Sequence, residues 1–336
     1  MSLKESYRRI LLSVGRETKK GVGRRPLARR LLWWLAFGIA LVGAAIAVRY
    51  FWLSRPEGEG PAGPPVPAEA FARVWTTRKV LLLGVGDSIT AGYGVPQEHA
   101  YVARLAANPA DEFPDMEGIC LSAVLPNLRI ENIAVSGSTS LDHLAILRQR
   151  PKKQEPDVLG LVVMTTGGND LIHSYGRMPP REGAMYGATL QQARPWIAAY
   201  ESRLAAMIEL LKKQFPGGCH IFLGDIYDPT DGTGSALGTG LPAWPDGAGI
   251  HRAYNEIIHR AAERDPCVHL VPMWQAFLGH GIHSTKFWHR HYRRDDPHYW
   301  YGSNLEDPND RGYDALRRLF LLEMIKTQMM SWYPLR

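Results

Sequence analysis

Cysteine is scarce in this sequence: only Cys120, Cys219 and Cys267 occur among 336 residues. No pair of them has the spacing of a metal-binding motif, and an H-E-x-x-H metalloprotease motif is absent. So few cysteines exclude a disulfide-rich scaffold. We expect all three to be small buried side chains, with one disulfide as the alternative in an exported domain. Internal repeats are also absent.

Positive charge is confined to the N-terminus. Ten basic and two acidic side chains give residues 1–30 a net charge of +8, so the other 306 residues carry −2 of the total of +6. A basic tail on a near-neutral body gives no reason to expect a nucleic-acid-binding surface. We therefore predict no nucleic-acid partner.

One hydrophobic run is long enough to cross a membrane. Residues 31–48 contain no charged side chain, and Arg49 separates them from the apolar residues 50–53. A bilayer span needs about 20 apolar residues, and an arginine near its end can extend its charge to the headgroups. We predict a transmembrane helix over 31–53, with the basic tail 1–30 in the cytoplasm and the rest of the chain on the exported, periplasmic or extracellular, side. A cleaved signal peptide is the alternative.

A segment rich in proline and glycine follows this helix. Residues 54–68 contain five prolines and three glycines, a composition that favours neither helix nor strand. We expect residues 54–75 to be a linker that holds a domain, residues 76–336, away from the membrane.

From residue 76 onward, short apolar runs alternate with helical patterns. Two of the runs, Val162-Val163-Met164 and Ile221-Phe222-Leu223, are apolar without alternation, as in strands covered on both faces. Residues 196–214 repeat apolar side chains every three or four positions, which indicates an amphipathic helix. The alternation predicts an α/β fold with a parallel sheet between helices. Residues 232–249, rich in glycine, proline and alanine, predict a long loop that acts as a lid or a binding loop. The predicted strands are 80–85, 128–134, 158–165, 220–226 and 268–272, and the further predicted helices are 249–264 and 312–330.

Ser88 stands at the end of the first predicted strand. The apolar residues before it end in Gly84, Gly86 and Asp87. This order would deliver the Ser88 hydroxyl to the carboxyl edge of the sheet, where open α/β folds bind their ligands. The alternative is a simple turn in which Ser88 caps a helix.

Two later strands also end in residues that can serve acyl transfer, which needs a nucleophile, a base and donors aimed at the developing oxyanion. Gly137 follows the second strand, and a glycine there lets its backbone N–H approach a ligand. Asn169 follows the third, and its side-chain N–H₂ can point to the same place. Alternatively, the glycine marks a plain turn and the asparagine caps a helix.

Together these segments carry a family resemblance. Gly86-Asp87-Ser88, Gly137 and Gly167-Gly168-Asn169-Asp170 resemble, in this order, the first three conserved blocks of the SGNH (GDSL) hydrolase family. The resemblance covers most of residues 78–325. It implies a flavodoxin-like three-layer α/β/α sandwich, in which Ser88 is the nucleophile and no cofactor is needed. It also implies an oxyanion hole formed by the N–H groups of Ser88 and Gly137 and the side chain of Asn169.

The fourth block of this family, Asp-x-x-His before Pro-Asn, matches in two ways. Spacing selects Asp295 and His298. We predict that His298 is the general base, because a triad needs an imidazole, and that Asp295 orients it. Alignment on Pro308-Asn309 would instead place Asp307 at the histidine position and Asn304 at the aspartate position, which leaves no imidazole.

Three residues beside these motifs are candidates for substrate binding. Asp87 precedes the nucleophile, and Tyr299 and Trp300 follow His298, where aromatic rings can stack on a sugar. The five histidines between residues 280 and 298 would also suit a zinc site, but we expect no metal.

The sequence thus predicts a membrane-anchored serine esterase with a Ser-His-Asp mechanism, acting on an ester of a small molecule, a glycan or a lipid. Two alternatives remain. An O-acyltransferase of the cell envelope would share every motif. A non-catalytic binding protein on a decayed hydrolase scaffold would explain the absent histidine before Pro308-Asn309.

Overall fold

The computed structural model describes residues 25–150, 152–236 and 239–331. They belong to two compact units, divided between Tyr50 and Phe51. The first unit contains α2, which spans Arg25–Val48, and the π-helical turn η1 (Arg49–Leu53) continues this helix into the first residues of the second unit. Arg29–Leu53 is long and apolar enough to cross a membrane, with a mean hydropathy of 2.3 in its most apolar stretch, although a signal sequence has the same properties.

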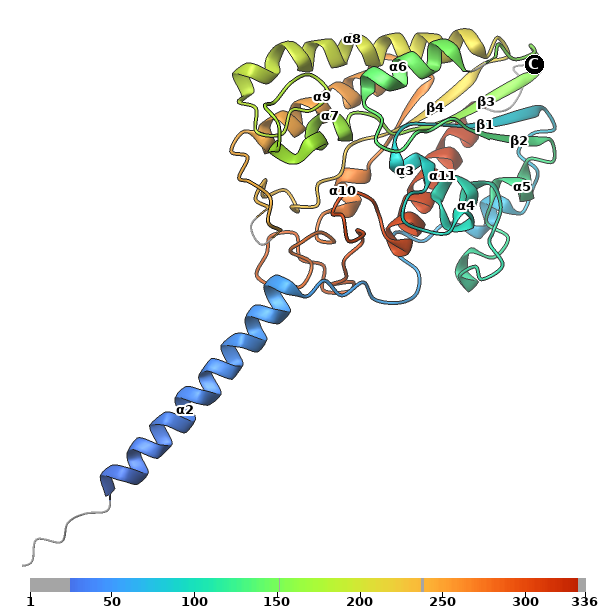
Figure 1. Ribbon diagram of the computed structural model, residues 1–336. Coiled ribbons are helices and arrows are strands. Elements are labelled where there is room, and N and C mark those ends of the chain that lie inside the picture. The colour runs from blue at the N-terminus through green and yellow to red at the C-terminus, as the bar shows by residue number, and fades with distance from the viewer. Residues whose placement is uncertain (1–24, 151, 237–238, 332–336) are drawn as a thin grey trace, which may run out of the picture. The chain divides into compact units, whose positions relative to one another are not determined.

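The second unit is built on a parallel five-stranded sheet with the strand order β2-β1-β3-β4-β5 (Figure 1). This order is that of flavodoxin-like folds, which bind ligands at the carboxyl ends of the strands. The strands are β1 (Lys79–Val85), β2 (Leu128–Asn132), β3 (Val158–Met164), β4 (Cys219–Gly224) and β5 (Val268–Val271).

Helices cover both faces of the sheet. Val80 and Leu82 of β1 belong to one apolar core, and Leu81 and Leu83 belong to the other, because successive side chains of a strand point to opposite faces. Helices α4, α5 and α11 pack on the first core, and α6, α8 and α9 on the second (Figure 1). The helices are α3 (Ser88–Ala91), α4 (Tyr101–Ala106), α5 (Leu121–Val124), α6 (Ser140–Gln149), α7 (Gly168–Ile172), α8 (Leu190–Gln214), α9 (Gly247–Arg264), α10 (Met273–Phe277) and α11 (Asp310–Ser331), with short 3₁₀ helices η2 (Ala68–Phe71), η3 (Gln97–His99), η4 (Pro114–Met116) and η5 (His173–Gly176).

The predicted α/β/α sandwich is therefore confirmed. All five predicted strands and the three predicted helices are present. Strands β2 to β5 end one or two residues before their predicted ends. The loops that follow these strand ends carry the candidate site.

The proline-rich segment, residues 54–68, is part of the segment predicted as a linker, and Arg311 holds it against the domain. We term it the strap. Proline-rich backbone has few N–H groups with which to pair its own carbonyls, and a guanidinium group can donate to several of them at once. Arg311, in the first turn of α11, donates hydrogen bonds to three strap carbonyls: those of Glu57 at 3.0 Å, Gly60 at 3.2 Å and Pro61 at 3.2 Å.

Candidate active site

Ser88 is the first residue of α3 and follows β1 through a sharp turn. Gly86 in this turn has a φ of +149°, and a Cβ atom there would lie 2.5 Å from Thr165 Oγ1, so only glycine fits. Asp87 caps α3, because its Oδ1 accepts a hydrogen bond from the N–H of Ile89 at 3.1 Å. The turn leaves Ser88 9% exposed at the carboxyl edge of the sheet.

Asp87 is a buried carboxyl group next to this serine. Its Oδ1 also accepts a hydrogen bond from Thr165 Oγ1 at 3.0 Å. Burial raises the pKa of Asp87 to about 6, against the opposing effect of the hydrogen bonds from Thr165 and Ile89. Asp87 lines the same cavity as Ser88.

The two other predicted oxyanion-hole segments are tied to each other and to this turn. Asn169 in α7 donates its Nδ2 to the carbonyl of Ser138 at 2.9 Å, next to Gly137. The Ser138 hydroxyl in turn donates to the carbonyl of Gly86 at 3.2 Å. Gly137 has a φ of +79° and is exposed, with no atom within 4 Å of the place where a Cβ would stand. Hydrogen bonds therefore fix the three loops at one edge of the sheet.

The Asp307 carboxyl group interacts with the Ser88 hydroxyl, and both residues line the same cavity. Asn304 donates its Nδ2 to Asp307 Oδ2 at 2.7 Å. Burial raises the pKa of Asp307, and hydrogen bonding from Ser88 and Asn304 opposes this rise. Its Oδ1 is buried and has no well-aligned hydrogen-bond partner among the described residues, which leaves it able to take a proton. The arrangement corresponds to the alignment on Pro308-Asn309.

His298 and Asp295 lie elsewhere. His298 Nδ1 is 2.5 Å from Asp296 Oδ1, and its ring lies against Gly58 of the strap. Arg311 binds both carboxylate oxygens of Asp296, each at 3.0 Å, and so holds this pair on the strap. Asp295 is exposed. Neither His298 nor Asp295 lines the cavity that contains Ser88 and Asp307.

Tyr299 and Trp300 are buried in the core, at 2% and 3% exposure. Trp300 stacks on His280 with 3.4 Å between ring centroids, and its Nε1 donates to Asp296 Oδ2 at 3.1 Å. The structure therefore does not bring these two aromatic residues to Ser88, because their rings pack inside the domain.

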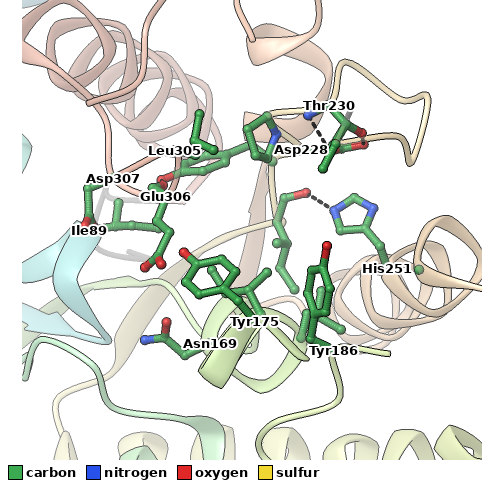
Figure 2. A pocket seen from close by; sticks show the side chains of 18 of the residues that line it. Ile89, Asn169, Tyr175, Tyr186, Asp228, Thr230, His251, Leu305, Glu306 and Asp307 are labelled. Carbon is green, nitrogen blue, oxygen red and sulfur yellow. Dashed lines mark hydrogen bonds between the residues drawn. The ribbon is translucent and has the colours of Figure 1, made fainter. Parts of the chain in front are cut away.

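An apolar cavity of about 150 Å³ lies beside Ser88. Part of its wall comes from the loop predicted over 232–249, whose Trp244 packs 4.9 Å from the ring of Tyr186. Figure 2 shows Tyr175 and Tyr186 standing side by side within it. The apolar lining includes Leu171, Ile172, Tyr175, Tyr186, Ile226 and Trp244.

Two further titratable groups face this cavity. Burial and the charges of Asp307 and Asp87 raise the pKa of Glu306 to about 7. His251 in α9 is within 2.8 Å of the carbonyl of Ile226 through its Nε2 and lies across the cavity from Asp307 (Figure 2). The sequence analysis missed Glu306 and His251, since no motif marks them.

No group of three histidine, cysteine or acidic side chains among the described residues has a geometry that could hold a metal ion. Cys120 and Cys219 are buried, Cys267 is half-buried, and each of the three is a free thiol.

Comparisons with known proteins match this part of the chain. The GDSL-like Lipase/Acylhydrolase family matches residues 85–315. Esterase TesA of Pseudomonas aeruginosa is 34% identical over 113 residues, which are 34% of this chain and 48% of that protein, so the chain spans about half the length of this curated relative. Among solved structures, phospholipase A1 of Streptomyces albidoflavus is 17% identical with a TM-score of 0.47, covering 74% of this chain and 99% of that one. The acetylxylan esterase Axe2 of Geobacillus stearothermophilus is 18% identical with a TM-score of 0.44, covering 77% and 98%.

Proposed function

Because the chain belongs to the GDSL-like lipase/acylhydrolase family, we propose that it hydrolyses carboxylic esters with Ser88 as the nucleophile. One observation carries the proposal: Ser88, Asp307 and Asn304 form a continuous chain of contacts at the mouth of an apolar cavity. A nucleophile, a base and a group that orients the base are the parts that acyl transfer requires.

In this mechanism Asp307 is the general base, the role that spacing had suggested for His298. The ionised carboxylate takes the proton of the Ser88 hydroxyl while Oγ attacks the ester carbonyl carbon. The neutral Asp307 then returns the proton to the departing alcohol as the tetrahedral intermediate collapses. A water molecule then attacks the acyl-enzyme and gives a proton to Asp307. Collapse of the second tetrahedral intermediate releases the acid, and the Ser88 oxygen regains its proton from Asp307. Burial supports this role, since a carboxylate of raised pKa is a stronger base.

The oxyanion would be held by the N–H groups of Ser88 and Gly137 and by Asn169. The hydrogen bond from Asn169 to the Ser138 carbonyl uses one of its two side-chain N–H donors and leaves the other for the substrate. Donors fixed in this way before the substrate binds contribute roughly 3–4 kcal/mol each in comparable sites.

The cavity indicates the substrate class. Its wall is mainly aliphatic and aromatic, which favours an ester with an apolar acyl or alcohol group over a free sugar. Asp87, Glu306 and Asp307 add acidic groups near the nucleophile, so a neutral ester is favoured over an anionic one.

We further propose that Arg29–Leu53 anchors the enzyme in a membrane. The ten basic residues among the first 30 support a cytoplasmic N-terminus and an exported catalytic domain.

Replacement Ser88→Ala tests the nucleophile. Hydrolysis of p-nitrophenyl butyrate should fall to background while the circular dichroism spectrum stays unchanged, and a fluorophosphonate probe should label the parent chain but not this variant. Retained turnover in Ser88→Ala would refute the assignment.

No hydrogen bond joins an imidazole to Ser88 within residues 25–150, 152–236 and 239–331, which favours one second candidate, a binding protein that has lost catalysis. It predicts that the probe leaves the parent chain unlabelled, whereas ester or lipid ligands still bind the cavity.

A further inference from the structure

Four aromatic side chains pack together in the second unit, where the apolar helix Arg29–Leu53 ends. The Phe51 ring lies 4.7 Å from the Trp288 ring and 5.9 Å from the Phe287 ring, and Trp52 lies 5.8 Å from Trp288. We term these four residues the aromatic cluster. Phe51 and Trp52 belong to the apolar helix, whereas Phe287 and Trp288 belong to a loop more than two hundred residues later.

The cluster is exposed to an extent that packing inside the domain does not explain. Phe287 is 65% exposed, Trp288 52% and Trp52 43%. Contiguous exposed apolar side chains of this size mark an interaction surface.

The loop that carries Phe287 and Trp288 is basic. Residues 286–294, which we term the basic loop, contain Lys286, Arg290, Arg293 and Arg294 and no acidic residue. Arg290, Arg293 and Arg294 are exposed, and the ammonium group of Lys286 lies 5.4 Å from the centre of the Trp52 ring. Exposed carboxylates flank this surface at Asp295, directly after the basic loop, and at Glu57 and Glu59 on the strap. Tryptophan is enriched at the headgroup layer of a membrane, and arginine is attracted to anionic headgroups.

We propose that the aromatic cluster and the basic loop seat the catalytic domain on an anionic lipid surface. The inference rests on the proposed membrane anchor. Phe51 and Trp52 lie in the last three residues of Arg29–Leu53. If that helix spans the bilayer to its end, the side chains packed on Phe51 and Trp52 lie at the headgroups. A protein partner is disfavoured, since the surface begins within the membrane-spanning segment itself.

The strap supports the same geometry. Arg311 binds its carbonyls from Glu57 to Pro61, so the chain after Leu53 is held against the domain within a few residues. A free linker, which would let the domain leave the membrane surface, is therefore absent between Leu53 and the described domain.

A spin label at position 287 tests this surface in the full-length chain. Phe287→Cys, in a Cys267→Ser background that removes the half-buried thiol, is labelled with a nitroxide and reconstituted in vesicles. A matched label replaces Ile130, which is 54% exposed on β2. Accessibility to molecular oxygen and to a water-soluble nickel chelate is measured by electron paramagnetic resonance.

In vesicles containing phosphatidylglycerol, the label at 287 should be several-fold less accessible to the nickel chelate than the label at 130, and more accessible to oxygen. The protection should weaken in phosphatidylcholine vesicles and in the variant Arg290→Glu/Arg294→Glu. Equal accessibility of the two labels to the nickel chelate overturns the proposal. A label at Trp288→Cys repeats the measurement if substitution at 287 disturbs the fold.

Two parallel measurements separate the proposals. If the chain floats with vesicles and hydrolyses ester while the label at 287 stays in water, only the lipid-binding surface is wrong. If the chain fails to float, the anchor and the surface are both wrong. If the label is protected but ester hydrolysis is absent, the surface stands and the catalytic proposal fails.

Discussion

Asn304 donates a hydrogen bond to Asp307 at 2.7 Å, and Asp307 in turn contacts the hydroxyl of Ser88. In an Asp-His-Ser triad, the imidazole becomes a cation when it takes the serine proton, and the aspartate stabilises that cation. Here the base would begin as an anion and become neutral, so the neutral amide of Asn304 suffices to orient it. The negative charge then passes from Asp307 to the oxyanion without a second charged partner.

The first prediction concerns this base. Asp307→Asn keeps the size of the side chain but removes its basicity, so kcat should fall about 10²–10⁴-fold, the usual contribution of a general base. Hydrolysis of p-nitrophenyl butyrate and the rate of fluorophosphonate labelling of Ser88 both measure the effect. His298→Ala is the matched control and should keep near-parent activity, because His298 contacts Asp296 and the strap.

His251→Ala tests the imidazole across the cavity. Activity that survives Asp307→Asn but not His298→Ala or His251→Ala would assign the base to that histidine.

The second prediction concerns pH. Burial raises the pKa of Asp307, and the base must be ionised, so activity should rise with pH through this raised pKa. Burial and the charges of Asp307 and Asp87 raise the pKa of Glu306 to about 7. Above this pH Glu306 adds a further negative charge to the cavity that holds the developing oxyanion, and kcat should decline. Glu306→Gln should therefore remove the alkaline decline and leave the acid limb in place. A pH profile of kcat checks this, and an unchanged alkaline limb in Glu306→Gln would exclude Glu306 as its cause.

The catalytic edge of the sheet was largely predictable from sequence, whereas the base was not. Ser88, Gly137 and Asn169 each follow a strand, and parallel strands bring their carboxyl ends to one edge. The proposed base, Asp307, instead lies in the loop before α11, whose path depends on tertiary contacts. Asp295-x-x-His298 has suitable spacing, but Arg311 holds Asp296, and with it His298, on the strap. The preceding proline-rich segment gave no sequence signal for that contact.

The third prediction concerns stability. Burial raises the pKa of Asp87 from 3.8 to about 6 in the folded state. Between these values the folded protein holds a proton on Asp87 that the unfolded chain has lost, so the contribution of Asp87 to stability should fall as pH rises from 4 to 6 and level off above. The shift corresponds to a loss on the order of 3 kcal/mol. Asp87→Asn, whose amide oxygen can still accept hydrogen bonds from Ile89 and Thr165, should be more stable than the parent at pH 7 and lack this slope. Urea unfolding at pH 5 and pH 7 measures it, and parallel pH dependence in both proteins would contradict the prediction.

The fourth prediction concerns the strap. Arg311 forms paired hydrogen bonds with Asp296 and donates to strap carbonyls, with a side chain that is 9% exposed. Arg311→Met keeps much of the volume but leaves a half-buried carboxylate and several carbonyls without their donor. The free energy of unfolding should fall by on the order of 3 kcal/mol. Proteases should cut within residues 54–68 of this variant, whereas this segment should be protected in the parent protein. Arg290→Met removes an exposed arginine and should change the unfolding free energy by less than about 0.5 kcal/mol. If both variants resist proteolysis equally, contacts other than those of Arg311 hold the strap against the domain.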